Sequence, residues 1–175
     1  MLTRGNVERT FTNPTAKDVT DYMLETRAML RKFYAEEQTS GRSDRFQRWP
    51  LFIASMPQFR KIAAMKGLFE LSDNMNDRFF EDSIGLVSDW RKSGPVWEIP
   101  FGTLVPRKTK NLFAAGRCIS SIGDAWEITR CIPCACLTGE AAGCAAALRC
   151  GSDDELTSSV QKLMEKNGTR LHWSK

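Results

Sequence analysis

Two short segments of the sequence carry the residue types of an anion-binding site. An apolar run at 112–115 ends at Gly116 and is followed by Arg117. Further along, Arg130 stands just before a predicted helix that begins near residues 131–133. A glycine after a strand lets a ligand approach the backbone, and the first turn of a helix presents unpaired amides at the positive end of its dipole. The combination therefore favours an anionic ligand.

The helix predicted after Arg130 carries a stripe of very small residues. Gly139, Ala142, Gly143 and Ala146 repeat at helical spacing. Each glycine costs a helix up to about 1 kcal/mol relative to alanine, so the stripe needs a physical reason. We expect it to lie close against a sheet or a cofactor, although the spacing alone is equally compatible with ordinary tight packing.

These segments need a scaffold, and the first third of the chain predicts one long helix. We expect the helix to begin at residues 13–15, where a short polar side chain can cap free amides and proline is tolerated in the first turn. Residues 36–48 predict a loop, and the apolar residues 49–56 predict a buried segment. The apolar positions of the helix recur every three or four residues and predict a core face made of Val19, Tyr22, Met23, Thr26, Met29, Leu30 and Phe33.

The rest of the chain predicts short strands followed by two helices. Residues 91–95 have the glycine and proline of a turn, so the strands on either side of them predict a hairpin. The continuous apolar run at 112–115 predicts a strand buried on both faces. In order, the predicted elements are a strand at 68–71, a short helix from Ser72-Asp73 to Phe79 or Phe80, strands at 84–90, 96–99 and 112–115, and helices from 131–133 to Arg149 and from Ser152 or Asp153 to Asn167-Gly168.

The composition is that of an ordinary globular domain. The chain has 175 residues, of which 42% are hydrophobic, and 25 Lys and Arg against 21 Asp and Glu give a net charge of +4. The two signs are interleaved, which disfavours a nucleic-acid partner. No apolar run reaches the roughly 20 residues of a membrane helix, and no signal peptide follows Met1. We therefore expect a soluble, cytoplasmic protein with no membrane partner.

The cysteines offer a second kind of chemistry. Six are present, and Cys131, Cys134 and Cys136 are close enough in sequence to suggest a metal or redox site. A structural zinc site needs four converging ligands, and the remaining cysteines supply no second Cys-x-x-Cys. Without a secretory signal, we expect reduced thiols that pack as small side chains, and no bound metal.

Other polar residues are weaker candidates. The lone histidine, His172, has no nucleophile that the sequence pairs with it, so we expect a packed or solvated side chain. Asp124 and Glu127 can orient a substrate, although loop carboxylates are usually solvated. Arg60 and Lys61 can bind an acidic substrate, although most such pairs are surface charges.

Four segments of the C-terminal half also share an order and a spacing with a known family. They are Ile99-Pro100-Phe101-Gly102-Thr103-Leu104-Val105-Pro106, Asn111-Leu112-Phe113-Ala114-Ala115-Gly116-Arg117-Cys118-Ile119-Ser120, Arg130-Cys131-Ile132-Pro133 and Gly139-Glu140-Ala141-Ala142-Gly143. Together they resemble the C-terminal part of the FAD-dependent oxidoreductases with a two-dinucleotide-binding-domain fold. In that family, similar segments complete the FAD site. The resemblance is close over roughly the last half of the chain and weaker upstream.

The resemblance implies a fold and a cofactor. The fold would be an α+β fragment of an α/β, Rossmann-like FAD-binding flavoprotein, with long helices and a small sheet. Amides at the start of a helix near the flavin would stabilise the negative charge of its reduced form. By carry-over, two residues lie by the ribityl and pyrophosphate part of FAD and four approach the flavin; these are, in order, Gly116 and Arg117, then Arg130, Ile132, Pro133 and Cys134.

The sequence departs from the family in two respects. The family cradles the FAD phosphates with an N-terminal strand, a GxGxxG turn and a helix, and this sequence contains no such motif. In addition, Gly123 and Asp124 stand where relatives commonly have His and Glu, and Pro57 and Gln58 replace an Arg-Glu pair. The resemblance therefore names no substrate, and Arg60 and Asp124 stand as tentative substrate-binding residues.

Two interpretations follow. The favoured one is the C-terminal portion of a longer FAD-dependent oxidoreductase, in which residues 1–98 form a substrate-side region and residues 99–175 complete the FAD-binding domain. It would serve hydride or electron transfer with a small organic substrate and would need an N-terminal flavoprotein half or partner chain. The alternative is a degenerate, non-catalytic module that mediates protein–protein interaction, and a basic nucleic-acid-binding surface is a weaker third option.

Overall fold

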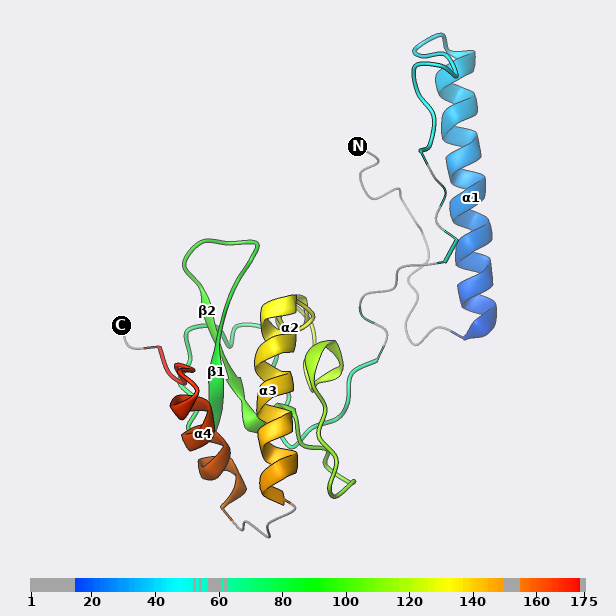
Figure 1. The fold of residues 1–175 in the computed structure, drawn as a ribbon. Coiled ribbons are helices and arrows are strands. Elements are labelled where there is room, and N and C mark those ends of the chain that lie inside the picture. Colours follow the sequence, from blue (N-terminus) through cyan, green and yellow to red (C-terminus); the bar gives the residue numbers. More distant parts are fainter. Residues whose placement is uncertain are drawn as a thin grey trace. The chain divides into compact units, whose positions relative to one another are not determined.

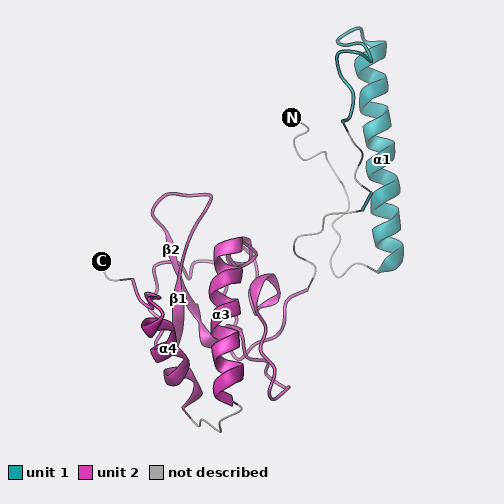
Figure 2. Cartoon of the chain, viewed as in Figure 1, with its two compact units in different colours: residues 1–62 teal, residues 63–175 magenta. Residues whose placement is uncertain are grey.

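The computed structural model describes residues 15–51, 53, 55–56, 61, 63–149 and 155–173 of the chain (Figure 1). The chain divides into two compact units, Met1–Ile62 and Ala63–Lys175 (Figure 2). The functional division predicted at residue 98 stays a prediction. The elements, in order, are α1 (Ala16–Thr39), β1 (Ser83–Ser88), β2 (Val96–Pro100), 3₁₀ turns at Phe101–Thr103 and Gly116–Cys118, α2 (Ala125–Thr129), α3 (Ile132–Arg149) and α4 (Leu156–Lys166).

Helix α1 begins where the sequence predicts. The side chain of Thr15 accepts a hydrogen bond from the backbone N–H of Asp18 (3.3 Å), and the carboxylate of Asp18 accepts one from the backbone N–H of Thr15 (2.9 Å). This capping box satisfies two amides at the start of the helix. The helix continues to Thr39, so the predicted loop begins later, at Ser40.

The apolar side chains of the first unit are mostly half-buried on the predicted face of α1 and mostly exposed on the segment after it. Of the residues of α1 only Glu37 is buried, where it pairs with Arg42 (2.7 Å) and with Arg48. The predicted face of α1 is therefore partly covered rather than a buried core, and the predicted burial of residues 49–56 is wrong for the described residues. The physical reason is that the described part of this unit contains one helix and a return segment, with no second layer to cover them. The exposed side chains of the return segment include Trp49, Leu51, Ile53 and Met56.

Strands β1 and β2 form the predicted hairpin at nearly the predicted bounds. They pair antiparallel, with Ser88 opposite Val96, and the register shifts between Ser83 and Leu86. Together with the helices, this small antiparallel sheet gives the α+β architecture that the sequence predicts.

Two predicted elements upstream of the hairpin do not form. Residues 68–71 make no strand, and Leu71 is joined to the rest of the unit by an isolated bridge. Residues 72–80 form turns instead of a helix, because Asn74 and Asp77 adopt left-handed backbone angles (φ 61° and 55°). Polar residues that favour turns thus determine the backbone conformation of residues 72–80.

The apolar run at 112–115 is not a strand either. Leu112 is 51% exposed, and Ala114 donates its backbone N–H to the carbonyl of Leu104 (2.9 Å). A strand buried on both faces needs paired strands beside it and cover on both faces. The described residues place no paired strand next to this run, so the prediction is wrong for this chain.

Helices α3 and α4 confirm the two predicted helices of the second unit. Helix α4 ends at Lys166 with Asn167 as its C-cap, and Gly168 follows in the left-handed region (φ 92°). The predicted caps Ser152 and Asp153 lie outside the described residues. Both helices pack on the β1–β2 hairpin (Figure 1). The largest fully buried apolar side chains of the resulting core are Trp97, Leu71, Ile84, Ile99, Leu104, Ile119, Ile128, Met164 and Val160.

The close contact between α3 and the sheet depends on Gly85 in β1. A Cβ atom at this position would lie 2.6 Å from Cδ1 of Leu137 and 3.0 Å from Cγ2 of Thr169, and the residue has φ +146°. Neither the contact nor the backbone angle suits an L side chain. The glycine in the strand, not a glycine in the helix, therefore permits this approach.

The small-residue stripe of α3 faces away from this contact. Positions 139 and 143 have no atom within 4 Å of a built Cβ. The prediction that the stripe packs against the chain's own sheet is wrong, because another face of the helix is buried. Packing of the stripe against a cofactor stays a prediction. The buried residues of α3 are Cys134, Thr138, Ala141 and Ala145.

Every helix in the described part of the chain is too short or too polar to cross a membrane.

Replacing Gly85 with alanine should destabilise the second unit by about 1–3 kcal/mol, because the new methyl group meets Leu137 and strains the backbone. Gly143→Ala is the matched control. Its added methyl group enters open space on a helix, so it should stabilise the chain by up to about 1 kcal/mol. Urea denaturation of both variants measures the effects. A Gly85→Ala midpoint at or above that of the wild type would show that the contact does not constrain the fold.

Candidate functional site

The turn at Gly116 is held against the first turns of α3. Gly116 lies in the left-handed region (φ 68°), and its backbone N–H donates to Oγ1 of Thr138 (2.8 Å). The same hydroxyl donates to the carbonyl of Cys134 (2.6 Å). A Cβ on Gly116 would lie 3.5 Å from that of Ala135, so the backbone angle rather than crowding favours glycine. The structure thus brings two of the sequence-predicted segments together.

The start of α3 is uncovered. Ile132 is 79% exposed and Pro133 is also exposed, whereas the side chain of Cys134 is buried in the core. Within the helix, the amide of Ile132 has no carbonyl four residues back, whereas Pro133 has no N–H and Cys134 has no exposed surface through which its amide could reach a ligand. The amide of Ile132 and the positive end of the helix dipole make an electrostatically favourable place for a negative charge.

Arg130 lies directly before this helix start and is held in place on two sides. Its Nε donates to the carboxylate of Glu127 (2.7 Å), and Nη2 also contacts that carboxylate (2.5 Å). The guanidinium carbon lies 5.7 Å from the ring centroid of Trp90. The indole N–H of Trp90 in turn donates to the carbonyl of Glu127 (3.2 Å). Arg130 is therefore half-buried with a restricted orientation.

Arg117 differs from Arg130 in being exposed. Its carbonyl accepts a hydrogen bond from the indole N–H of Trp126 (2.7 Å), which ties the backbone of the Gly116 turn to α2. The backbone at Arg117 is thus fixed, while its side chain faces solvent.

A network around Arg91 was not predicted from the sequence. Arg91, in the loop of the hairpin, binds the carboxylate of Asp89 through Nε (3.1 Å) and Nη2 (3.0 Å). It also binds both carboxylate oxygens of Asp124, with Nη2 at 2.9 Å from Oδ2. The guanidinium holds the pKa of both carboxyl groups below the ordinary value, and the two carboxylates raise the pKa of Arg91. The alternating apolar pattern of the strands gave no signal for this pairing, because it joins residues 33 apart.

Asp124 is therefore engaged within the chain. Besides the ion pair to Arg91, its backbone N–H donates to the carboxylate of Asp73. Gly123 has φ +56°, and a side chain there would collide with the same Asp73 carboxylate. A substrate role for Asp124 stays a prediction. Arg60, the other tentative substrate residue, lies outside the described residues.

His172 is a packed side chain, as expected. Its Nδ1 lies 3.1 Å from Oε2 of the buried Glu98, and its ring stacks on Phe79 at a centroid distance of 4.5 Å. Glu98 also accepts hydrogen bonds from the backbone N–H groups of Phe80 (2.9 Å) and Trp173 (3.2 Å). This cluster joins the C-terminal residues to β2.

The five cysteines that the structure describes are free thiols. Burial raises the pKa of the Cys134 thiol to about 12 and also raises that of Cys131. A raised pKa leaves little thiolate at neutral pH, so neither group is suited to nucleophilic or redox chemistry. Among the described residues, no three His, Cys, Asp or Glu side chains converge in a way that could hold a metal ion.

The comparisons with known proteins give one match. The model of a family described as FAD dependent oxidoreductase matches residues 26–166, which is more than half of the chain. Neither a curated protein nor a solved structure matches the chain.

The Arg91 network should make the stability of the folded chain depend on pH in the acid range. Because Arg91 lowers the pKa of Asp89 and Asp124 below the ordinary 3.8, their contribution is present above that pH and is lost as the pH falls through the lowered values. We expect the urea midpoint to fall as the pH drops below about 3.8, and to fall less in Asp124→Asn. Glu165→Gln, an exposed change on α4, is the control and should keep the wild-type profile.

The cysteines should differ in reactivity. In the folded chain, Cys118 and Cys136 are exposed and should react first with a thiol reagent at neutral pH, whereas Cys134 should be the slowest of the described thiols. All six cysteines should react when the chain is unfolded without reductant. Mass spectrometry after timed labelling assigns each site. Fast labelling of Cys134 in the folded chain would contradict its burial.

Proposed function

Because this chain belongs to the family of FAD dependent oxidoreductases, we propose that it completes the flavin site of such an enzyme for hydride or electron transfer with a small organic substrate. The chain would act as the C-terminal portion, with residues 99–175 on the FAD side and residues 1–98 on the substrate side. An N-terminal flavoprotein half or partner chain would supply the phosphate cradle, because the sequence contains no GxGxxG motif.

The observation that carries this proposal is the juxtaposition of the Gly116 turn with the uncovered start of α3. The hydroxyl of Thr138 links the two segments through hydrogen bonds of 2.8 and 2.6 Å. A tight glycine turn beside a helix start suits a ligand that lies along the backbone and carries negative charge. The residues present therefore fit the flavin end of FAD, whereas the pyrophosphate end would need groups from elsewhere.

In the proposed site, FAD would supply the electron-accepting ring, and the chain would supply orientation and electrostatics. The backbone amide of Ile132 would donate toward negative charge on the bound group, and Pro133 and Cys134 would complete the backbone of that turn. A guanidinium has five N–H donors, so the contacts of Arg130 with Glu127 leave Nη1 for the ligand. Trp90 and Glu127 would keep that donor in position.

A second candidate function is a non-catalytic interaction module. It is favoured by the uncovered side of α3, where Gly139 and Gly143 border open space and Ile132 is exposed. Small residues on a helix allow another backbone to approach closely. A flavoprotein half would also cover this face, so binding of a partner does not distinguish the two candidate functions. Binding of FAD does.

The isolated chain should bind FAD weakly or not at all, since only one end of the cofactor would be contacted. Fluorescence titration with FAD measures this directly. A chain that purifies yellow, with stoichiometric FAD and micromolar affinity, would contradict the proposal that a second half is needed.

Arg130→Ala should weaken FAD binding or lower the flavin reduction potential once the chain is combined with a GxGxxG-containing half, because a positive charge near the flavin is removed. Lys166→Ala on α4 is the matched control, since it removes one exposed positive charge away from the site. Equal FAD affinity and equal potential for wild type and Arg130→Ala would remove Arg130 from the site. An assembled complex that never retains FAD would favour the interaction module.

A further inference from the structure

A cavity lies in the second unit, away from the proposed flavin site. Its volume is about 980 Å³, which is at the upper end of the range for small-molecule sites. It is bordered by the loop at 105–113, the end of α3 and the beginning of α4, and it contains none of the predicted flavin-contacting residues. It therefore needs an explanation of its own.

The cavity has an aromatic floor. Phe69, Phe101 and Phe113 line it, and the rings of Phe101 and Phe113 lie 6.0 Å apart between centroids. Phe101 is buried and fixed in the core, while Phe69 and Phe113 are half-buried and keep part of their surface available. Such a floor suits a flat, apolar group.

One wall of the cavity is basic. It contains Arg107, Lys108, Lys110 and Arg149, and all four residues are exposed. The wall is anchored because Arg107 donates through Nε to the carbonyl of Gly67 (2.7 Å). Four positive charges around one hollow favour a ligand with more than one negative charge.

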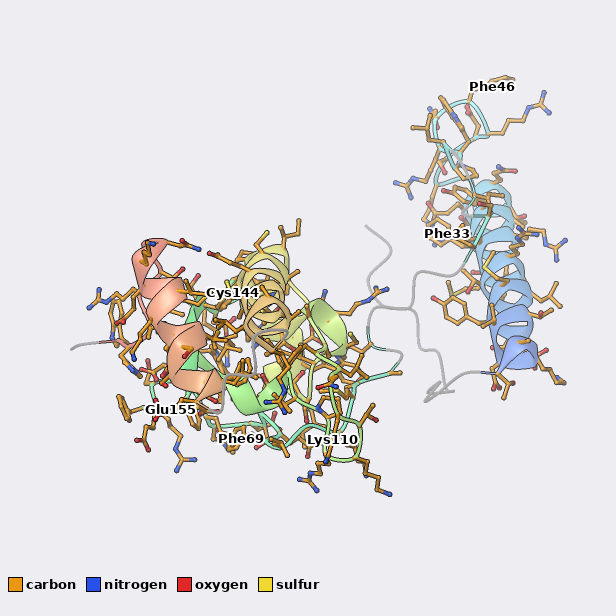
Figure 3. The ribbon with its side chains drawn as sticks, turned by 60° about the horizontal axis from the view of Figure 1, so that its bottom comes forward. Phe33, Phe46, Phe69, Lys110, Cys144 and Glu155 are labelled. Carbon is orange, nitrogen blue, oxygen red and sulfur yellow. The ribbon has the colours of Figure 1, made fainter. Side chains whose placement is uncertain are left out.

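The opposite end of the cavity is acidic. Glu81, Asp82 and Glu155 line it, and Figure 3 shows Glu155 and Lys110 at opposite sides of Phe69. The carboxylate of Asp82 already accepts the backbone N–H of Gly102 (2.9 Å). Each carboxylate has two acceptor oxygens, so this end can accept hydrogen bonds from hydroxyl or amino groups of a ligand, and its negative charge would repel further phosphates. This asymmetry disfavours a continuous nucleic-acid backbone and sets an orientation for a small ligand.

We propose that this cavity binds a nucleoside phosphate, with the base on the aromatic floor, the phosphates at the basic wall and the hydroxyl or amino groups toward the acidic end. The three chemical zones of the cavity match the three parts of such a molecule. A free nucleotide and the nucleotide portion of a larger cofactor share this chemistry, so the test includes both.

The test is a calorimetric titration of the full chain with ADP, adenosine, pyrophosphate and FAD. ADP should bind with a dissociation constant below about 1 mM, and at least about tenfold more tightly than adenosine or pyrophosphate, because only ADP reaches both the floor and the basic wall. Its affinity should fall with added salt. No ADP binding at millimolar concentration would overturn the proposal, as would pyrophosphate binding as tight as that of ADP.

Paired substitutions locate the site. Lys108→Glu with Lys110→Glu should weaken ADP binding at least about tenfold, because two contacts to phosphate become repulsive. Lys162→Glu with Lys166→Glu makes the same charge change on exposed positions of α4 outside the cavity, and should change ADP affinity less than about twofold. Equal losses in both pairs would overturn the assignment. If ADP binds and FAD does not, the cavity is assigned to free nucleotides. If FAD binds weakly and its binding is lost together with that of ADP in the Lys108 and Lys110 variant, the cavity is assigned to the nucleotide portion that they share.

Discussion

The hydrogen bond from the backbone of Gly116 to the hydroxyl of Thr138 is the interaction on which the candidate flavin site depends. It joins a loop to a helix that begins 16 residues later, and the same hydroxyl is anchored to the carbonyl of Cys134. Thr138 is fully buried and Gly116 is half-buried, so the loss of this bond would leave the partly buried amide of Gly116 and the buried hydroxyl without each other as partners. The left-handed turn and the start of α3 are therefore fixed relative to each other before any ligand binds.

Helix α3 combines two different surfaces. One side packs on the hairpin and uses Gly85 of β1 to approach it, and the other side, with Gly139 and Gly143, borders open space. The start of the helix is exposed along with this second side. A helix that carries costly glycines on an open face is consistent with a surface that another polypeptide or a cofactor covers, which both proposed functions require.

The Arg91 network determines where the loop of the hairpin lies against α2. Arg91 binds Asp89 on its own loop and Asp124 just before α2, and the neighbouring Trp90 contacts the backbone of Glu127. Glu127 in turn binds Arg130, so it connects the Arg91 network to that side chain. Positions that are far apart in the sequence thus determine the orientation of one arginine at the helix start, and the fold supplies an ordered charge rather than a flexible one.

The sequence by itself determined the helices α1, α3 and α4, the hairpin and the family, because periodicity, caps and turn residues act over a few positions. It also located Gly116, Arg130 and the start of α3. It failed at 68–80 and at 112–115, where turn-forming residues or missing neighbours overrode apolar runs. Only the tertiary structure decided that Arg91 pairs with Asp124, which face of α3 is buried and which apolar residues stay exposed, because these outcomes depend on contacts between residues that are remote in the chain.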